Sequence, residues 1–163
     1  MISISVQEQD FDTGEEYRQL QQADPEINSS VVNGTDVGGV AIFTGQVRDL
    51  ADNPLKFMRL EHYPGMTEKS LQQTADQATE RWPTIDIRII HRIGDLAPGE
   101  QIVFVGVSSA HRDAAFAACE FIMDILKTSA PFWKKEQHVN GSSGWVDAKN
   151  ADQQRAERWQ DGA

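Results

Sequence analysis

The chain has 163 residues, 39% of them hydrophobic and 25% charged, which is typical of a globular domain with a buried core, and we expect a single domain over residues 1–163. Its formal net charge of −10 argues against nucleic acid and acidic membrane surfaces as partners, because both bind basic proteins. No apolar run approaches the roughly 20 residues that cross a bilayer, and the N-terminus lacks the features of a signal peptide, so we expect a cytoplasmic protein.

The N-terminal segment is expected to form a strand and a helix. Apolar residues alternate with polar ones at 2–6, which predicts a short edge strand. A helix should follow, with Asp12 or Thr13 as its N-cap and with Tyr17 and Leu20 facing inward.

The next segment predicts a loop and two strands. Residues 24–38 are rich in turn formers and predict a flexible loop. β-Branched and aromatic residues at 39–48 predict a strand, in which Gly45 indicates a bulge or a close backbone approach. A further strand at 55–63 is expected to be its antiparallel neighbour.

The middle of the chain alternates between helix and strand patterns. Thr67 should cap a helix that runs to about Trp82, where Pro83 stops it. The alternation at 85–91 and the apolar run at 101–108 predict two strands that pair like a hairpin.

A second long helix is expected from about Ser109 to Thr128. Its buried face should contain Phe116, Cys119, Ile122 or Met123, and Leu126. Cys119 is the only cysteine, so it cannot form an internal disulfide, and its place on this face favours a core residue over a nucleophile.

The C-terminal segment should contain a loop at 141–147 that leads into a short strand, and a polar helix at 152–159. The order of the elements along the chain predicts an α+β fold with a mainly antiparallel sheet and packed helices.

The stretch 127–136 combines a helix-stopping proline, two aromatic residues and three lysines in an acidic chain. We interpret it as part of a lysine-lined pocket for a small anion, with Phe132 and Trp133 as its floor and the segment 108–113 as its wall. A simpler alternative exists for each lysine. Lys127 at a helix C-terminus is favoured by the helix dipole by roughly 0.3–1 kcal/mol, and the other two could be solvated surface residues.

Three further residues are candidate anion ligands. His111 and Arg112 come at the start of a helix, where free backbone N–H groups and the dipole favour anions. The alternative is that Arg112 pairs with Asp113 or Glu120 on the surface. Arg48 could bind an anion as well, or could be an ordinary cation at the end of a strand.

Common cofactor motifs are absent from the sequence. It has no phosphate-binding glycine loop and no dinucleotide fingerprint. The four histidines are scattered, so the sequence predicts no metal site.

Five longer stretches are specific enough to indicate a family. They are Phe43-Thr-Gly-Gln-Val-Arg48, Leu60-Glu-His-Tyr-Pro-Gly-Met-Thr-Glu-Lys69, His91-Arg-Ile-Gly94, Val103-Phe-Val-Gly-Val-Ser-Ser-Ala-His-Arg112 and Phe121-Ile-Met-Asp-Ile-Leu-Lys-Thr-Ser-Ala-Pro-Phe-Trp-Lys-Lys-Glu136. With them the sequence resembles the large, catalytic subunit of molybdopterin synthase over roughly residues 39–159. The resemblance implies an α/β-hammerhead type of fold.

The resemblance also implies a reaction and its partners. Enzymes of this family convert cyclic pyranopterin monophosphate (precursor Z) into molybdopterin by inserting two sulfurs as a dithiolene. The sulfur arrives as a thiocarboxylate on the C-terminal Gly-Gly of a small ubiquitin-like subunit of β-grasp fold. The expected assembly is a heterotetramer around a homodimer of large subunits, and no cofactor is required.

The resemblance finally implies the roles of individual residues. Lys127 and Lys134 resemble the catalytic lysines of the family. The substrate-binding set, which includes both lysines, adds Gln46, Val47, Arg48, His111, Arg112, Lys135 and Glu136. The pocket wall is expected to include Phe43, Met123 and Lys149. The chain departs from many relatives at Gln46, where they carry lysine, and at Lys149, where they often carry arginine.

Two other functions remain open from the sequence. One is a non-catalytic anion-binding or adaptor module that docks a ubiquitin-like protein. The other is a hydrolase of a pterin or nucleotide phosphate, which would act without a protein partner.

Overall fold

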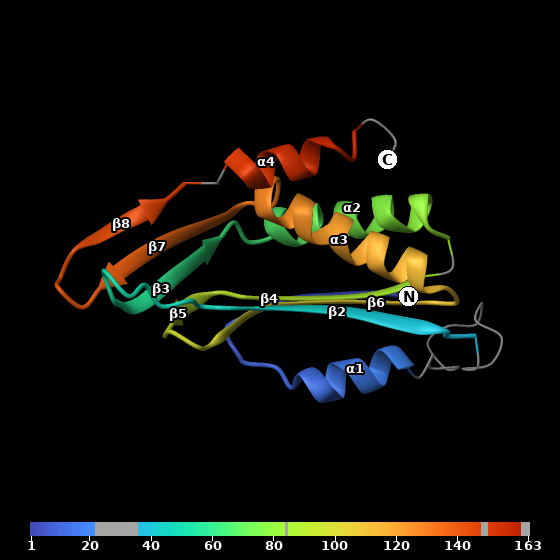
Figure 1. Ribbon diagram of the computed structural model, residues 1–163, viewed down its shortest axis with the longest axis horizontal. Coiled ribbons are helices and arrows are strands. Elements are labelled where there is room, and N and C mark those ends of the chain that lie inside the picture. The colour runs from blue at the N-terminus through green and yellow to red at the C-terminus, as the bar shows by residue number, and fades with distance from the viewer. Residues whose placement is uncertain (22–35, 84, 148–149, 161–163) are drawn as a thin grey trace.

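The computed structural model describes residues 1–21, 36–83, 85–147 and 150–160 (Figure 1). Its elements in chain order are β1 (Ile2–Gln7), α1 (Thr13–Gln21), β2 (Gly39–Gln46), β3 (Leu55–His62), α2 (Met66–Arg81), β4 (Ile85–Arg92), β5 (Gly94–Leu96), β6 (Gln101–Ser109), α3 (Arg112–Thr128), β7 (Phe132–His138), β8 (Ser143–Val146) and α4 (Asn150–Glu157). The fold is α+β, as predicted from the order of elements. None of the helices in these residues is long and apolar enough to cross a membrane.

The first sheet has the strand order β1-β4-β6-β2. Strand β1 lies at its edge and runs parallel to β4, whereas β4 pairs antiparallel with β6 and β6 antiparallel with β2. The predicted edge strand and the predicted pairing of the strands at 85–91 and 101–108 are therefore confirmed. The short strand β5 lies between them in sequence and was not predicted.

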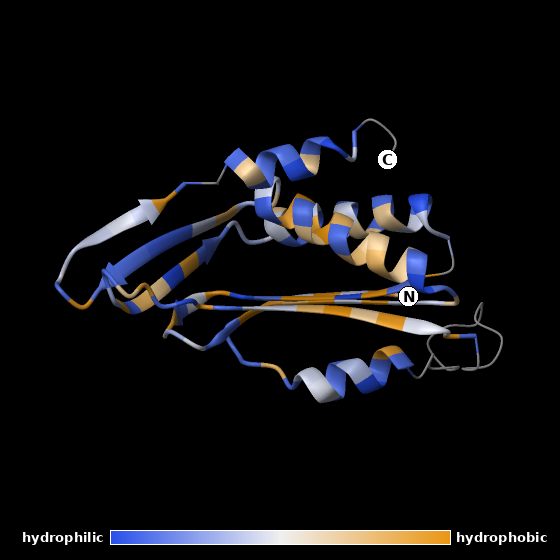
Figure 2. Cartoon of the chain, in the orientation of Figure 1, coloured by the Kyte–Doolittle hydropathy of each residue, from blue (hydrophilic) through white to orange (hydrophobic). Residues whose placement is uncertain are grey.

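Helices cover both faces of the first sheet (Figure 1). Helices α2 and α3 lie on one face, where alternate residues such as Ile87 and Ile89 of β4 join Val105 and Val107 of β6 in the main core. Helix α1 lies on the other face, where Leu20 packs with Phe104 and Ile90. Figure 2 shows the hydrophobic colour concentrated along this sheet and on α3. The alternation of the strands thus supplies a separate apolar surface to each helical layer.

The second sheet has the order β5-β3-β7-β8, and all of its pairs are antiparallel. The prediction that β3 is the neighbour of β2 is wrong, because β2 pairs with β6 and β3 pairs with β5 and β7. Strand β7, over residues 132–138, was not predicted as a strand. Alternation shows which face of a strand is apolar but does not identify the strand that it pairs with. Strand β2 pairs with β6 and β3 pairs with β7, and both partners are distant in sequence.

Strand β2 ends in an irregularity that matters for the site. The register with β6 shifts between Gly45 and Gln46, so the predicted bulge is confirmed. A Cβ on Gly45 would lie 2.9 Å from Val103 Cγ1, so a larger residue there would have to displace the Val103 side chain. Beyond the bulge, Val47 donates its backbone N–H to the Glu100 carbonyl and accepts the Gly99 N–H, which holds the backbone just before Arg48.

Two predictions about inward-facing helical residues are wrong. Tyr17 is 36% exposed, although Leu20 on the same helix is buried, and Phe116 is 66% exposed on α3. The buried face of α3 instead contains Cys119, Ile122 and Leu126, as predicted, together with residues between them. Helix α3 packs against α2, α4 and the sheet, and Phe116 lies outside these contacts.

The helix starts also differ from the predictions. Asp12 caps α1 by accepting the Glu15 N–H, as expected. Helix α2 instead begins after Gly65, whose positive φ of 83° suits glycine, and Thr67 lies inside the helix. The Thr67 hydroxyl accepts the Tyr63 N–H and donates to the Pro131 carbonyl, so it joins the start of α2 to the chain before β7. Most of the loop predicted at 24–38 lies outside the described residues.

Candidate functional site

A cavity opens where the two sheets meet at the C-terminal end of α3. It has two adjoining lobes of about 350 Å³ and about 340 Å³. The residues that line both lobes are Gln46, Ile102, Lys127, Phe132 and Lys134. We call the lobe that also contains Arg48 the outer lobe, and the lobe that contains His91 the inner lobe.

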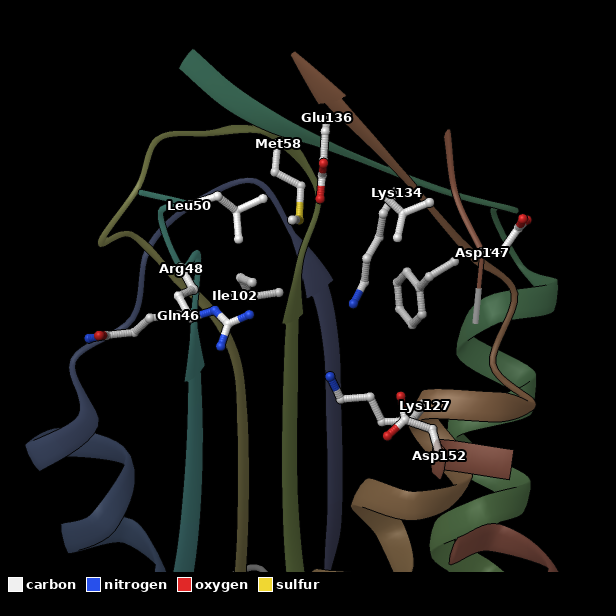
Figure 3. A pocket seen from close by; sticks show the side chains of 12 residues that line it. Gln46, Arg48, Leu50, Met58, Ile102, Lys127, Lys134, Glu136, Asp147 and Asp152 are labelled. Atoms are coloured by element: carbon white, nitrogen blue, oxygen red, sulfur yellow. The ribbon is translucent and has the colours of Figure 1, made fainter. Parts of the chain in front are cut away.

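Three cations reach this cavity from three different elements. Lys127 lies in the last turn of α3, Lys134 lies on β7, and Arg48 follows the bulge at the end of β2. Figure 3 shows the two lysine side chains directed toward one another and the Arg48 guanidinium directed toward the same space. Residues far apart in sequence therefore form one positively charged group, as the interpretation of stretch 127–136 requires.

The alternation of β7 decides which of its residues face the cavity. Phe132, Lys134 and Glu136 line the outer lobe. Their neighbours point to the opposite face of the sheet: Trp133 is 49% exposed, and the ammonium of Lys135 lies 5.7 Å from the ring centroid of Trp145 on β8. Phe132 therefore forms part of the cavity floor, as expected, and Trp133 does not.

Carboxylates also border the outer lobe. Glu136, Asp147 and Asp152 line it together with the three cations, so its described lining has no large excess of positive charge. Glu136 Oε2 lies 3.2 Å from Nε2 of His138. Glu136 comes from β7, Asp147 follows β8 and Asp152 lies in the first turn of α4. The ammonium groups of Lys127 and Lys134 are directed into the lobe (Figure 3).

The inner lobe combines apolar and polar side chains. Phe43 and Met123 line it, as the expected pocket wall, with Val103 and Leu126. His91 lines it as well, with only 7% of its surface exposed and its ring stacked on Phe132 at a centroid distance of 3.7 Å. Burial, reinforced by the positive charges of Lys134 and Lys127, lowers the pKa of His91 to about 4, so the ring is neutral at pH 7.

Sequence reasoning did not assign His91 to the site. A signal was available, because His91 continues the alternation of Ile87 and Ile89, which places it on the α3 side of β4. A polar residue on such an apolar face usually reflects a specific contact.

One expected site residue, Val47, lies away from the cavity. Val47 is 2% exposed and packs with Leu55, Leu60 and Leu96, away from the cavity lining. Lys149 lies outside the described residues. Cys119 is buried, and burial raises the pKa of its thiol to about 11, as expected of a core cysteine.

The segment 108–113 does not form a wall of this cavity within one chain. The 17-residue helix α3 is about 25 Å long at about 1.5 Å per residue, and it separates Arg112 at its start from Lys127 at its end. The Arg112 side chain is 86% exposed and lies 3.7 Å from Asp113, the surface pair that was the simpler alternative. Glu120, the other possible partner of Arg112, pairs with Arg158 instead.

The sequence profile described as "MoaE protein" matches residues 6–129 of the chain. A protein of Vibrio cholerae, the "Molybdopterin synthase catalytic subunit", is 54% identical over 96% of this chain and 97% of its own length. The "Molybdopterin biosynthesis MoaE protein" of Burkholderia ambifaria has a similar structure, with a TM-score of 0.77, 46% identity, and coverage of 98% of this chain and 99% of that one. The molybdopterin synthase structure from Staphylococcus aureus has a TM-score of 0.74 at 32% identity, covering 87% of this chain and 95% of that one.

Proposed function

This chain belongs to the MoaE protein family, and we propose that it is the catalytic subunit of a molybdopterin synthase, which converts cyclic pyranopterin monophosphate into molybdopterin by sulfur insertion. The observation that carries this proposal is the convergence of Arg48, Lys127 and Lys134 on one cavity in a chain so similar to catalytic subunits of that enzyme. The predicted cytoplasmic location stays a prediction.

The cations suit an anionic substrate and its reaction. Arg48 can bind a phosphate with two parallel hydrogen bonds, which fixes its orientation. Opening the cyclic phosphate develops negative charge, which the fixed ammonium group of Lys127 would stabilise. We assign to Lys134, on the opposite wall, the transfer of a proton or the retention of the intermediate. Because the sulfur donor carries its own nucleophile, the buried Cys119 is not needed.

We further propose that the sulfur donor is a second, small ubiquitin-like subunit. Relatives named as catalytic subunits imply an enzyme with another subunit. Its C-terminal Gly-Gly thiocarboxylate would enter the cavity beside Lys127. A glycine tail is narrow and flexible, and therefore suits a lobe of about 350 Å³ that must also admit the substrate.

A second copy of the chain is proposed to complete the site with His111 and Arg112. Strand β2 is an edge strand in the described part of the chain, and Phe43 on it and Phe116 on α3 are 42% and 66% exposed. If two copies pair their β2 strands antiparallel across a two-fold axis, the Gly39 end of one strand lies beside the Gln46 end of the other. Gly39 adjoins Arg112, so the Arg112 of the second copy would approach the cavity.

Reconstitution tests the catalytic assignment. The purified chain, a thiocarboxylated small subunit and cyclic pyranopterin monophosphate should together form molybdopterin. Lys127→Ala should lower turnover by about 10²–10³-fold, the range for the loss of one preorganised charge-stabilising group. Lys56→Ala is the control, since Lys56 is exposed on β3 and outside the cavity lining. Unchanged turnover by Lys127→Ala would support the adaptor alternative.

A mixed dimer tests the shared site. Differently tagged Lys127→Ala and Arg112→Ala chains are co-expressed, and the heterodimer is isolated by both tags. Each parental homodimer should be nearly inactive. The heterodimer contains one site with both mutations and one intact site, so it should have about half the wild-type turnover per dimer. A heterodimer as inactive as its parents would contradict a site built from two copies.

A further inference from the structure

His91 is a buried polar residue that lines the inner lobe and has no part in the reaction proposed above. Its Nδ1 lies 2.8 Å from the carbonyl oxygen of Arg92. A carbonyl oxygen only accepts hydrogen bonds, so Nδ1 must carry the proton and donate it. In the neutral ring, Nε2 is then a lone-pair acceptor. Among the hydrogen bonds found within the described residues, the contact of Nδ1 with Arg92 is the one that involves the His91 ring.

The surroundings hold the ring in this one state. Stacking on Phe132, at an angle of 17° between the planes, fixes the ring orientation. The charges that act on it come from three elements: Lys134 on β7, Lys127 on α3 and, if protonated, His62 on β3. All three disfavour a positive charge on the imidazole, as burial does. His91 therefore stays a neutral acceptor at pH values where an ordinary histidine would become a donor.

The inner lobe suits a flat ring with N–H groups on its edge. Phe43, Met123 and Phe132 provide apolar and aromatic surface. The two lysines that project into the lobe are donors only, so they cannot satisfy N–H groups of a ligand. A carboxylate at the position of His91 could accept such bonds, but it would pair with the lysines and lower their positive charge. A neutral imidazole accepts the bond without reducing the positive charge that the lysines present to the anionic part.

We propose that His91 is a substrate-binding residue, whose Nε2 accepts a hydrogen bond from a ring N–H of the pterin part of the substrate in the inner lobe, while the cations of the outer lobe bind its phosphate. This assignment rests on the proposed function and adds the orientation of the substrate to it. The phosphate lies toward Arg48 and the heterocycle toward β4.

Nitrogen NMR of the wild-type protein tests the acceptor state without a mutation. With ¹⁵N-labelled histidine, the His91 resonances should show Nδ1 protonated and Nε2 unprotonated from pH 8 down to about pH 5. Cyclic pyranopterin monophosphate should shift the Nε2 resonance in the direction of an accepted hydrogen bond. A ring that titrates between pH 6 and 7, or an Nε2 resonance that does not respond to the ligand, would overturn the proposal.

Two substitutions of His91 distinguish the contribution of Nδ1 from that of Nε2. Asparagine can place an amide at the position of Nδ1 only, whereas glutamine can reach the position of Nε2. In calorimetric titrations of the chain with the substrate, His91→Asn should raise Kd by about tenfold, and His91→Gln by less than about threefold. Ser108→Ala is the control for a buried polar substitution, because Ser108 is 1% exposed on the same sheet but outside both lobes. Equal binding by His91→Asn and wild type would contradict the assignment.

The same titrations distinguish the two proposals. If wild type forms molybdopterin and His91→Asn binds substrate normally, only the role of His91 fails. If wild type neither binds cyclic pyranopterin monophosphate nor forms molybdopterin, the proposed function fails, and the assignment of His91 fails with it.

Discussion

The two sheets of this molecule are built from similar strands but have different environments. The first sheet is covered on both faces by helices, and β6 is buried from Val103 to Ser109. In the second sheet, β7 is mostly half-buried and β8 is exposed throughout. Figure 2 shows the same contrast, with hydrophobic residues along the first sheet and hydrophilic ones along β7.

The difference indicates a division between stability and chemistry. A sheet buried on two faces contributes most of the apolar area removed from water and cannot hold unpaired charges. A sheet buried on one face can present charged residues to a cavity while its other face remains in solvent. Lys134 on β7 is such a charged residue. The two sheets meet where His91 on β4 stacks on Phe132 of β7.

The largest effect is expected when a substitution removes a large buried side chain of the first sheet and leaves a hole in the core. Phe104 is fully buried and packs edge-on against Phe11 at 5.9 Å. Phe104→Ala should lower the free energy of unfolding by about 3–5 kcal/mol, measured by urea denaturation. Phe57→Ala on the half-buried second sheet is the control and should cost clearly less. Similar losses for both variants would refute the difference in burial energy between the sheets.

The second prediction compares two neighbouring lysines on opposite faces of β7. Lys134→Ala should reduce molybdopterin formation by about 10²–10³-fold with little change in thermal stability, because it removes a cation from the cavity. Lys135→Ala should change the rate by less than about threefold, since its ammonium lies over Trp145 on the other face. A large loss in Lys135→Ala would mean that the outer face of the sheet binds substrate or partner.

The third prediction concerns the pH dependence of stability that is due to His91, the residue of the first sheet that stacks on Phe132 of the second. The pKa of His91 is about 4 in the folded protein and 6.5 in an ordinary histidine, so unfolding takes up a proton between these values. Stability should therefore fall as the pH falls from 6.5 to 4, by up to about 3 kcal/mol from this residue. Urea denaturation at several pH values should show a smaller loss over this range in His91→Gln than in wild type. Parallel curves for the two proteins would exclude His91 as the cause.

The smallest effect is expected on the solvent side of the second sheet. Arg59 and Asp95 form an ion pair at 2.7 Å, and the hydrogen bond from Arg59 lowers the pKa of Asp95, but both side chains are more than 40% exposed. Water and salt screen such a pair. Arg59→Ala should leave the denaturation midpoint unchanged in 0.5 M salt. A clear decrease at that salt concentration would show that this face carries more stability than its exposure indicates.

The sequence was sufficient for features that depend on local patterns. The alternation at 85–91, the apolar run at 101–108 and the helical spacing of Cys119, Ile122 and Leu126 are properties of short segments, and the structure confirms each of them. The bulge at Gly45 followed from a single glycine in a strand. The family followed from long motifs, whereas the roles of Lys127 and Lys134 stay predictions that rest on it.

The tertiary structure alone decided how these segments combine. Strand β3 belongs to the second sheet, Val47 faces the core, and Arg112 and Lys127 lie at opposite ends of α3. The meeting of His91 with Phe132 also depends on this arrangement. The physical reason is that a local period fixes which face of an element is apolar, whereas the choice of partner depends on contacts between segments distant in sequence.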